Sequence, residues 1–454
     1  MSLQSLLSIA RSALGVHQRQ LDVTAHNIAN ASTPGYSRQR LVTTPALPLQ
    51  LAMYTIGRGV EAVSIERTRN GFYDATYRRD NGLLGKSTTL RDYLGQVETA
   101  LNEPSDTGLS SSLDSLFSAF SDLAGNPAGH TNRELVVSAA NRLVDQLHSL
   151  TAQIGRTSLE AADNLRVQVA DVNSLSQRIA DLNTKILSTG GADHQAPDLQ
   201  DMRDQLIDEL SKFGNVRTVD HGDGTVGVIF GDTTLVDGAQ VTTLEPVGSG
   251  LGWAVRSALG GTVVDTQSGS LHALADLTQN RLPAARAQLD ALAGALVSEF
   301  NAIHRAGYTL SGATGVDFFD PAGTTAATIS LSATVRASSD NIAASANAAQ
   351  GNGAVAGQLA ALATSGVVSL GGSTFREHFV TLASGIGLDV RGAEQDIATQ
   401  ETLVERSDGF RQAESGVNVD DEMIDLVSAQ QAYQAAARLI SVADQMMKVI
   451  LDTF

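Results

Sequence analysis

The chain has no cysteine among its 454 residues, and only 4% of them are aromatic. The absence of cysteine excludes disulfide bridges, thiolate zinc sites and a cysteine nucleophile. The scarcity of aromatic residues argues against a deep ligand pocket, because such pockets are usually lined by large apolar rings. The composition therefore does not indicate small-molecule binding.

Basic residues are also scarce, with 31 Lys and Arg against 49 Asp and Glu, which gives a formal net charge of -18. Nucleic-acid binding requires basic side chains that neutralise phosphates, so we expect no nucleic acid as a partner. The acidic surplus is explained by solubility alone.

Long hydrophobic runs are absent too. No apolar stretch reaches the roughly 18 residues of a membrane-spanning helix, and we expect no membrane association. Residues 1–30 have no basic residue before Arg11, and their apolar residues are interleaved with polar ones, unlike a secretory signal peptide. Taken alone, these features suggest a cytoplasmic protein.

The polar residues do not form a recognisable catalytic or metal site. Asp220, His221 and Asp223 could ligate a metal, but their Gly-rich setting is typical of a hairpin turn. The acidic triplet at 420–422 resembles a carboxylate pair, although acidic residues at a helix start are favoured by the helix dipole. We therefore predict no enzyme activity, no cofactor and no metal.

Both ends of the chain carry heptad patterns. Near the N-terminus, one apolar line consists of Leu7, Leu14, Leu21 and Ile28, and the interleaved line of Leu3, Ala10, His17 and Thr24. At the C-terminus, steps of three and four alternate along Leu426, Ala429, Tyr433, Ala436, Ile440, Ala443, Met447, Ile450 and Phe454. Large residues alternating with mostly small ones allow two helices to approach closely, which predicts a seam between them.

The charges of the two ends are opposite. Residues 1–40 contain four arginines and one aspartate, whereas residues 416–454 contain two basic and six acidic residues. This difference favours pairing of the ends, although each exposed ion pair contributes only about 0–1 kcal/mol. The alternative is that two amphipathic helices dock separately on a globular core.

The fold class that we predict is mainly α with a smaller β-rich insertion, in an elongated, discontinuous multidomain protein whose N- and C-terminal helices pair as a coiled coil. The expected parts are an inner coiled-coil domain from 1–50 and 415–454, a helical middle domain from 51–212, 271–320 and 376–414, a β-rich insertion at 213–270, and a mixed, loop-rich insertion at 321–375. Within the helix expected at 198–212, Asp198, Asp201, Asp204 and Asp208 should face solvent.

The segment 26–39, HNIANASTPGYSRQ, lies where the first heptad helix stops. Asn30 suits a strained helix end, Pro34 ends any helix and Gly35 permits a turn. The residues expected to shape this turn run from Asn27 to Tyr36. As a whole, the segment resembles the N-terminal signature of the flagellar axial proteins, which include rod, hook and hook-associated subunits.

The C-terminal segment 416–447 is similar to the C-terminal signature of the same family. The matching positions are Val419, Glu422, Leu426, Gln430, Gln431, Tyr433, Gln434, Ala435 and Ala437. Three internal segments, 198–211, 222–236 and 298–312, resemble the hook-associated branch, whereas hook proteins pass early into β-rich domains. A hook or distal rod protein is the alternative, and an export-associated binding module is a further one.

The resemblance implies a structural subunit that joins hook to filament, outside the cell and exported without a cleaved signal peptide through the flagellar type III apparatus, which corrects the cytoplasmic interpretation. The implied partners are further copies in a ring, the hook protein, the next hook-associated or filament junction subunit, and an export chaperone. It also implies termini that fold on assembly. The residues expected at the assembly interface are Leu7, Leu14, Leu21, Asn27, Ile28, Asn30, Pro34, Gly35, Tyr36, Leu426, Tyr433, Ile440, Met447 and Phe454.

Overall fold

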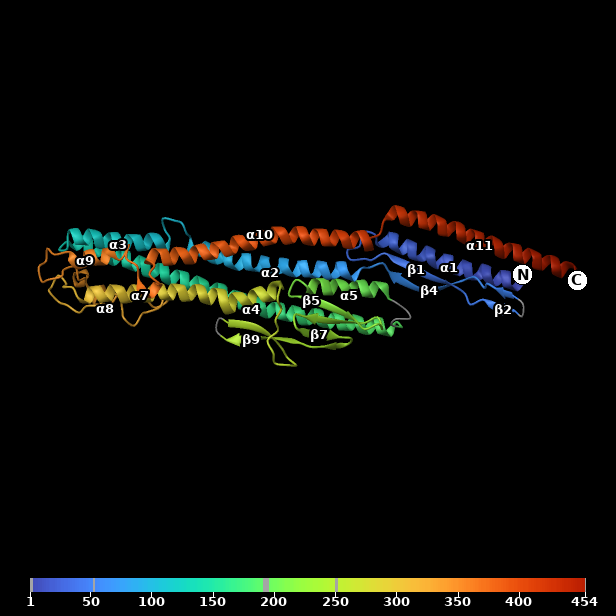
Figure 1. Cartoon of the computed structure of the whole chain (residues 1–454), viewed down its shortest axis with the longest axis horizontal. Coiled ribbons are helices and arrows are strands. Elements are labelled where there is room, and N and C mark those ends of the chain that lie inside the picture. The colour runs from blue at the N-terminus through green and yellow to red at the C-terminus, as the bar shows by residue number, and fades with distance from the viewer. Residues whose placement is uncertain (1–2, 52–53, 191–195, 250–251, 454) are drawn as a thin grey trace.

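The computed structural model describes residues 3–51, 54–190, 196–249 and 252–453, and it is elongated, with both termini at the same end (Figure 1). That end consists of two antiparallel helices, α1 (Leu3–Asn30) and α11 (Val419–Thr453). The remaining length is a helical body, in which the long helices are α2 (Gly71–Leu101), α3 (Leu109–Gly125), α4 (His130–Ser188), α7 (Leu282–Arg305) and α10 (Phe375–Ser415). The predicted fold class is confirmed.

Two short strand pairs lie beside α1. Strand β1 (Gln39–Pro45) pairs antiparallel with β4 (Val60–Arg67), and β2 (Leu49–Leu51) pairs with β3 (Tyr54–Ile56). The expectation of helix from residue 51 is therefore wrong as far as residue 67. Pro45, Pro48 and Gly57 divide this segment, so that β2 and β3 have only three residues each.

The region 213–270 is β-rich, as predicted. Its four-stranded antiparallel sheet consists of β5 (Val216–Asp220), β6 (Val226–Phe230), β7 (Thr233–Asp237) and β8 (Gln240–Val241), and a separate hairpin consists of β9 (Leu244–Ser249) and β10 (Gly252–Ser257). Gly222 and Gly224, in the turn after β5, have φ of +78° and +89°, which glycine adopts without strain. No group of three potential metal ligands occurs within the described residues.

The body contains two hydrophobic cores, both built along α4. The distal core lies around α3, α7 and the first half of α4. The last residue of α4 that belongs to this core is Ile154. The proximal core begins at Ala161 and joins α4 to α5 (Pro197–Leu210), α6 (Gly269–Asp276) and the β-rich region. Between them, the buried hydroxyls of Thr157 and Ser158 have no hydrogen-bond partner, and a π-helical turn at Leu277–Arg281 separates α6 from α7.

Residues 311–375 contain only α8 (Ala333–Ala337), α9 (Ala354–Ala361) and two 3₁₀ turns, Ser339–Asn341 and Val368–Leu370. Buried side chains of the long helices hold this loop-rich segment through its backbone. Arg133, on α4, donates to the carbonyl oxygens of Ser339 and Ile342 at 3.3 and 2.7 Å. The segment also contributes large side chains of its own to the distal core, among them Phe318, Phe319 and Leu331. None of the described helices is both long and apolar enough to span a membrane.

His304, on α7, also anchors this segment and is fully buried. Its Nδ1 lies 2.7 Å from the carbonyl oxygen of Val316, and its Nε2 accepts the N–H of Ala343 at 2.8 Å. Only a neutral ring with its proton on Nδ1 satisfies both partners. Burial accordingly lowers the pKa of His304 from 6.5 to about 4.

Between pH 6.5 and pH 4, the unfolded chain binds a proton at His304 that the folded chain does not bind. The free energy of unfolding should therefore fall by up to about 3 kcal/mol as the pH drops through this window. A His304→Asn variant should be less stable at pH 7 and should lose less stability on acidification. Urea unfolding at pH 7 and pH 4.5, followed by circular dichroism, measures the difference. The exposed-site variant His130→Gln should keep the pH dependence of the parent chain; an unchanged pH dependence in His304→Asn would contradict the assignment.

Candidate functional site

The terminal helices α1 and α11 meet along a line of small and polar residues. On α11 the buried positions recur every seven residues, at Glu422, Ala429, Ala436 and Ala443. On α1 the buried positions are Ala10, Val16, Val23, Thr24 and Asn27, of which Ala10 and Thr24 belong to the line that interleaves with the leucines. Side chains of this size let the two backbones approach closely, as the C-terminal pattern predicted.

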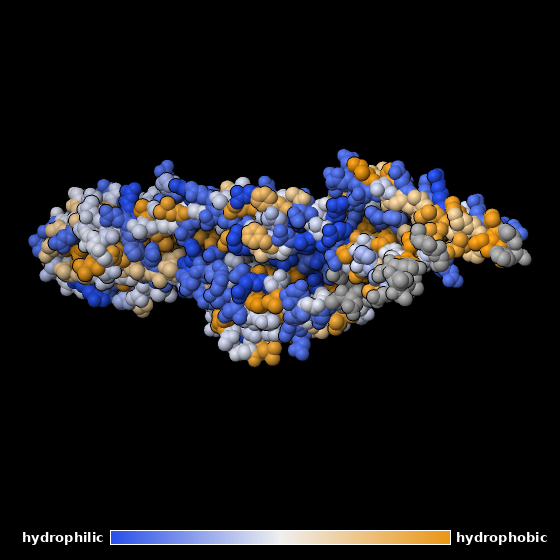
Figure 2. All heavy atoms as spheres, turned by 45° about the vertical axis from the view of Figure 1, so that its right-hand side comes forward, coloured by the Kyte–Doolittle hydropathy of each residue, from blue (hydrophilic) through white to orange (hydrophobic). Residues whose placement is uncertain are grey.

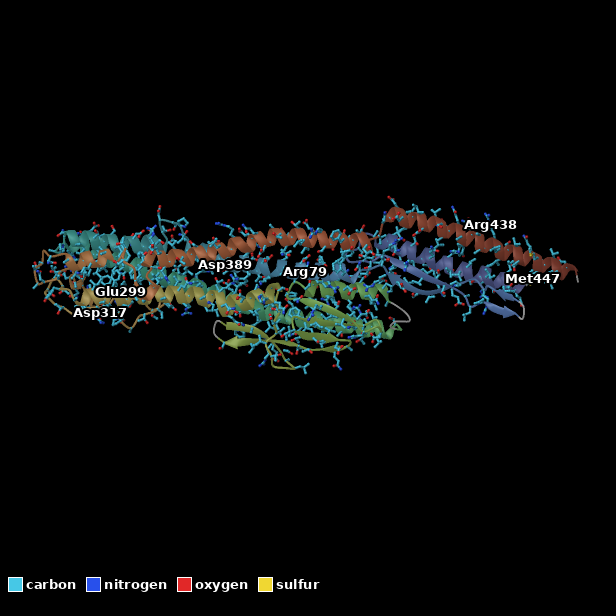
Figure 3. The ribbon with its side chains drawn as sticks, viewed as in Figure 1. Arg79, Glu299, Asp317, Asp389, Arg438 and Met447 are labelled. Atoms are coloured by element: carbon cyan, nitrogen blue, oxygen red, sulfur yellow. The ribbon has the colours of Figure 1, made fainter. Side chains whose placement is uncertain are left out.

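The large heptad residues lie beside this line and do not form its centre. The half-buried ones are Leu7, Leu14, Leu21, Ile28, Leu426, Tyr433 and Ile440. Met447, near the free end of α11, is 38% exposed (Figure 3), and Phe454 lies outside the described residues. The expectation that the leucines make the seam is thus corrected, because a close approach requires small residues at the centre and leaves large ones on its flanks. The role of these residues in assembly stays a prediction.

Asn27 connects the end of α1 to three other segments through its amide group. Its Oδ1 accepts the hydroxyl of Tyr36 at 2.8 Å and the N–H of Gln39 at 3.0 Å. Its Nδ2 donates to the carbonyl oxygen of Gln39 at 2.9 Å and to Oε2 of Glu422, on α11, at 3.0 Å. The buried amide therefore uses all four of its hydrogen-bonding positions.

Glu422 and Tyr36 complete this connection. The other carboxylate oxygen of Glu422 accepts Nε of Arg38 at 2.6 Å, and the backbone N–H of Arg38 donates to the carbonyl oxygen of Ser415, at the end of α10. Burial, together with the carboxylates of Asp198, Asp201 and Glu422, raises the pKa of Tyr36 above its ordinary value. Tyr36 therefore remains a neutral donor to Asn27.

The turn after α1 has the conformation that its sequence predicted. Gly35 has a φ of +75°, and an added Cβ would lie 2.2 Å from Nε2 of Gln205, on α5. That same nitrogen donates to the carbonyl oxygen of Pro34 at 2.6 Å. Asn30 was expected in a strained conformation, but it is not among the residues with positive φ; its amide instead donates to the carbonyl oxygen of His26 at 3.0 Å.

The acidic stripe of α5 is the surface on which this turn docks, so its expected solvent exposure is wrong for three of its four members. Only Asp198 is exposed, and it accepts Nε2 of Gln39 at 2.7 Å. Asp201, Asp204 and Asp208 are buried or nearly buried. The two carboxylate oxygens of Asp201 accept the N–H and the hydroxyl of Ser37, both at 2.8 Å.

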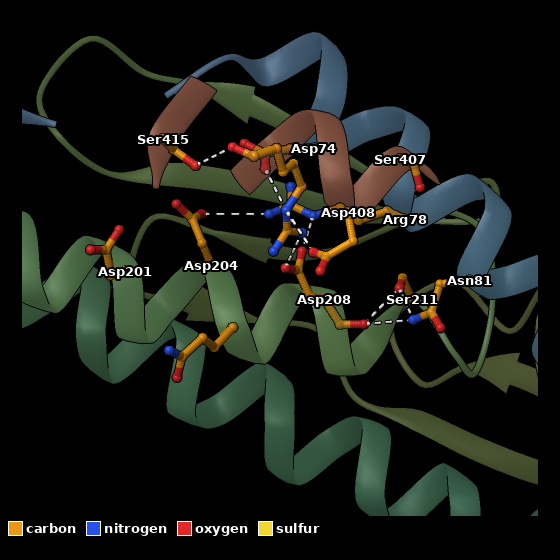
Figure 4. Close-up of polar contacts among 12 residues, drawn as sticks. Asp74, Arg78, Asn81, Asp201, Asp204, Asp208, Ser211, Ser407, Asp408 and Ser415 are labelled. Carbon is orange, nitrogen blue, oxygen red and sulfur yellow. Dashed lines mark hydrogen bonds and ion pairs between the residues drawn. The ribbon is translucent and has the colours of Figure 1, made fainter. Parts of the chain in front are cut away.

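Four arginines from three other elements surround the same carboxylates. We call the group of Asp201, Asp204, Asp208, Arg67, Arg69, Arg78 and Arg411 the Arg–Asp joint; Figure 4 shows its three aspartates and Arg78. Arg67, at the end of β4, lies 2.7 Å from Asp201 and 2.8 Å from Asp204. Arg69, in the linker that follows, lies 3.3 Å from Asp204. These ion pairs bind α5 to the end of β4 and to the linker that precedes α2.

The other two arginines bind Asp208 from the two helices that run along the body. Arg78, on α2, contacts one carboxylate oxygen at 2.6 Å, and Arg411, in the last turns of α10, contacts the other at 2.7 Å. The Arg–Asp joint therefore fixes α5, β4, α2 and α10 to one another, at the point where the terminal helices leave the body (Figures 1 and 4).

Asp204 lies at the centre of the joint. Burial alone would raise the pKa of this carboxyl, but Arg69, Arg67 and Arg78 together hold it well below its ordinary value. The group is therefore ionised at neutral pH, and its charge pairs with the arginines. Such a site is suited to holding elements in place, because its carboxylates are already engaged.

The sequence offered one signal for this joint that was not used. Four aspartates on one face of a helix, together with the Arg-Thr-Arg string at 67–69, indicate complementary charge. Nothing local shows that these segments, more than a hundred residues apart, lie together.

Comparison with known proteins agrees with this architecture. The family model "Flagellar hook-associated protein FlgK helical domain" matches residues 94–319, "Flagellar basal body rod FlgEFG protein C-terminal" matches 411–453, and "Flagella basal body rod protein" matches 7–36. The chain is 29% identical to flagellar hook-associated protein 1 of Bacillus subtilis over 98% of this chain and 97% of that protein. For the protein of the same name from Salmonella typhimurium, the identity is 29% over 70% of this chain and 59% of that protein.

A solved structure described as the flagellar hook junction protein FlgK from Burkholderia pseudomallei has the same fold, with a TM-score of 0.66 and 15% identity over 74% of this chain and 99% of that one. The three matching family models all describe flagellar proteins, and the chain is similar to this family of structural subunits, the axial proteins of the bacterial flagellum. Within that family, its similarity is to flagellar hook-associated protein 1.

Replacing Ala436 with leucine should force α1 and α11 apart, because the buried line has room only for small side chains. Overpacking of this kind typically costs about 1–3 kcal/mol. Hydrogen exchange of residues 3–30 should accelerate, while the exchange of the body stays unchanged. The neighbouring Ala435→Leu variant, at an exposed position of the same helix, should behave like the parent chain. Equal exchange rates in the two variants would contradict the close contact.

Replacing Asp204 with asparagine should leave the surrounding arginines without their central anion. Removal of one member of a buried ion-pair group typically costs about 3–5 kcal/mol. The single tryptophan, Trp253, lies in the proximal region, so its fluorescence during urea unfolding reports on this part of the chain. Glu209→Gln makes the same charge change at an exposed position of α5 and should leave the transition in place. A joint that contributes nothing would give coincident transitions for the two variants.

Proposed function

We propose that this chain joins the hook of the flagellum to the filament, as a structural subunit that works through its interfaces and catalyses no reaction. Support comes from the similarity to flagellar hook-associated protein 1, and from the match of the hook-associated helical domain to 94–319, a part of the chain where hook and rod proteins would differ. A hook or distal rod protein therefore remains the weaker alternative.

The observation that carries an assembly role is the uncovered apolar face of α11. Large apolar residues are exposed in the first turns of the helix and again from Leu439 onward, and Figure 2 shows them gathered toward the free end of the terminal pair. The exposed members are Val419, Met423, Ile424, Val427, Leu439, Val442, Met446, Met447, Val449, Ile450 and Leu451. A surface of this kind is favourable only when another protein covers it.

We propose that neighbouring subunits supply that cover and form a ring around the flagellar axis, with the hook protein on one side and the next hook-associated or filament junction subunit on the other. The inner domain would comprise α1, the strand pairs at 39–67 and α11, because β1 and β4 lie against α1. This extends the expected boundary from residue 50 to about residue 67.

Export through the flagellar type III apparatus, without a cleaved signal peptide, is proposed from the family resemblance, as is an export chaperone. Both agree with terminal helices that bury little apolar area as an isolated pair. Such helices gain most of their stability from packing, so we propose that they order fully on assembly.

The test is electron microscopy of cells that lack this chain, combined with an assay for flagellin in the medium. Hooks without filaments, together with shed flagellin, are expected. Cells that carry Ile440→Asp should look the same, because a charge beside the α1–α11 seam costs several kcal/mol when it is buried on assembly. Loss of the hooks themselves would instead assign the chain to the hook or the rod.

Ser441→Asp provides the control for Ile440→Asp, because Ser441 is an exposed polar residue next to it on the same helix. This strain should swim normally. Circular dichroism of both purified variants checks that the body remains folded. Motile flagella in the Ile440→Asp strain would contradict an assembly role for this part of α11.

A further inference from the structure

A groove of about 240 Å³ separates the C-terminal part of α4 from α5. Leu182 and Leu206, each 7% exposed, supply its buried apolar lining, and Met202 stands on its rim with 54% of its surface exposed. The remaining lining residues are Arg178, Asp181, Lys185 and Gln205. We call this feature the α4–α5 groove.

Met202 is the exception among the large apolar side chains of α5. Leu206, Ile207 and Leu210 are buried in the proximal core, whereas Met202 is left exposed beside them. A thioether side chain is flexible and polarisable, and it packs well on irregular apolar surfaces. The rim of the groove therefore offers an apolar contact that the core of the chain leaves uncovered.

The α4 side of the groove is basic. Arg178 and Lys185 are exposed and lie two helical turns apart on one face of α4, and neither forms an ion pair with a residue that the structure describes. Asp181 lies between them, and its carboxylate accepts Nε2 of Gln177 at 3.0 Å. Two basic residues thus stand against one acidic residue along the groove, and both are available to a partner.

The first turns of α11 expose a matching apolar surface. Its members are Val419, Met423, Ile424 and Val427, each between 43% and 68% exposed. Their spacing places them on one side of the helix, away from the buried line that contacts α1. Ile424 is the most exposed of the four, so it is the side chain best placed to enter a groove on another molecule.

Acidic residues accompany this apolar surface. Asp420 and Asp421 are exposed, and neither forms an ion pair with a described residue. Arg38 is already occupied, because it binds Glu422 at 2.6 Å and Asp425 at 3.4 Å. No basic residue occurs in α11 before residue 438. The start of α11 is therefore apolar and acidic, and it complements a groove that is apolar and basic.

The groove and the start of α11 lie at the same level along the molecule. Asp198, one turn before Met202 on α5, accepts Nε2 of Gln39 at 2.7 Å. The backbone N–H of Gln39 donates to Asn27, and Asn27 donates to Glu422 of α11 at 3.0 Å. Three hydrogen bonds thus connect the two regions across the end of α1, where the terminal helices meet the body (Figure 1).

The groove and the start of α11 lie on opposite sides of the body. The aspartates of the Arg–Asp joint occupy one face of α5, and Arg411 brings the end of α10, and with it the start of α11, to that face. Met202 and Leu206 precede and follow Asp204 by two residues, a rotation of about 200°, so they lie on the other face. Figure 1 agrees, with α11 along the upper edge and α4 and α5 below. One copy therefore cannot bring the two surfaces together.

We propose that the start of α11 in one copy docks in the α4–α5 groove of a second copy at the same level. Ile424 packs there on Met202, and Asp420 and Asp421 meet the basic side of the groove. Because the two surfaces differ and lie on opposite sides, the contact is head-to-tail, and it closes into a ring when the rotation between neighbours divides a full turn. This inference rests on the proposed function and adds to it the pair of surfaces through which subunits meet.

The absence of cysteine from the chain makes the test direct. A strain is made whose only copy carries Met202→Cys and Ile424→Cys, both at exposed positions. Its flagella are isolated, oxidised with copper phenanthroline and analysed on a non-reducing gel with an antibody against this chain. A ladder of dimers, trimers and higher species is expected, because each copy then links to two neighbours.

Two controls and one independent readout accompany the experiment. Each single-cysteine strain should stay monomeric, because the contact joins two different surfaces. Met202→Cys with Leu439→Cys is the matched pair and should give no ladder, since Leu439 is 45% exposed on the same helix but lies about 22 Å beyond Ile424. Antibody labelling of the same flagella shows whether the chain occupies the junction.

A labelled junction without a ladder would overturn this contact and leave the proposed function standing. An equal ladder in the Leu439→Cys pair would also overturn it, because the cross-link would then not depend on the start of α11. A cross-link to a different flagellar subunit would do the same, because the partner would not be a second copy. Flagella that do not contain the chain at the junction would overturn both proposals.

Discussion

The ion pairs between the aspartates of α5 and the arginines around them hold the molecule's two parts in a fixed relation. Asp201, Asp204 and Asp208 receive arginines from β4, from the linker before α2, from α2 itself and from α10. A buried group of charges contributes modestly to stability but is demanding in geometry, since a displaced partner leaves an uncompensated charge. The direction in which α1 and α11 leave the body is therefore set by electrostatics more than by hydrophobic packing.

This arrangement gives the signature residues of the two termini a common physical role. Asn27 links the end of α1 to Gln39 and to Glu422, and Gln205 holds the turn at Pro34 and Gly35. The start of α11 is thereby tied to the end of α1 and to the acidic helix of the body. Beyond Glu422, the fully buried positions of α11 are a narrow line of alanines, so the order of the paired helices depends on this anchorage and on what covers their outer faces.

Sequence patterns predicted the elements whose conformation is determined by residues close to them in the chain. Heptad spacing predicted the pairing of the ends, Gly222 and Gly224 predicted a hairpin turn, and Pro34 with Gly35 predicted the turn after α1. The strands at 39–67 were missed because prolines and glycines divide the segment, and because β1 pairs with β4, which lies about twenty residues further along the chain. The seam was assigned to the leucines because periodicity identifies faces of a helix, but does not show which face touches the partner.

The Arg–Asp joint was missed for a different reason. The burial of an aspartate depends on whether an arginine reaches it, and here the arginines are as far away in the sequence as Arg67 and Arg411. A helical stripe of four aspartates is compatible with solvent exposure or with a buried network, and its own residues do not distinguish the two. The burial of residues that pair with distant charges therefore could not be predicted from the sequence and was shown by the structure.

The continuity of α4 has a mechanical consequence. This helix has 59 residues and extends about 90 Å through both cores, while the side-chain packing around it changes at Thr157 and Ser158. A load applied along the long axis passes down one unbroken backbone, but a sideways force meets least resistance between the cores, where hydroxyl groups replace interlocking apolar side chains. We expect the body to resist compression along its long axis and to bend most easily between the two cores.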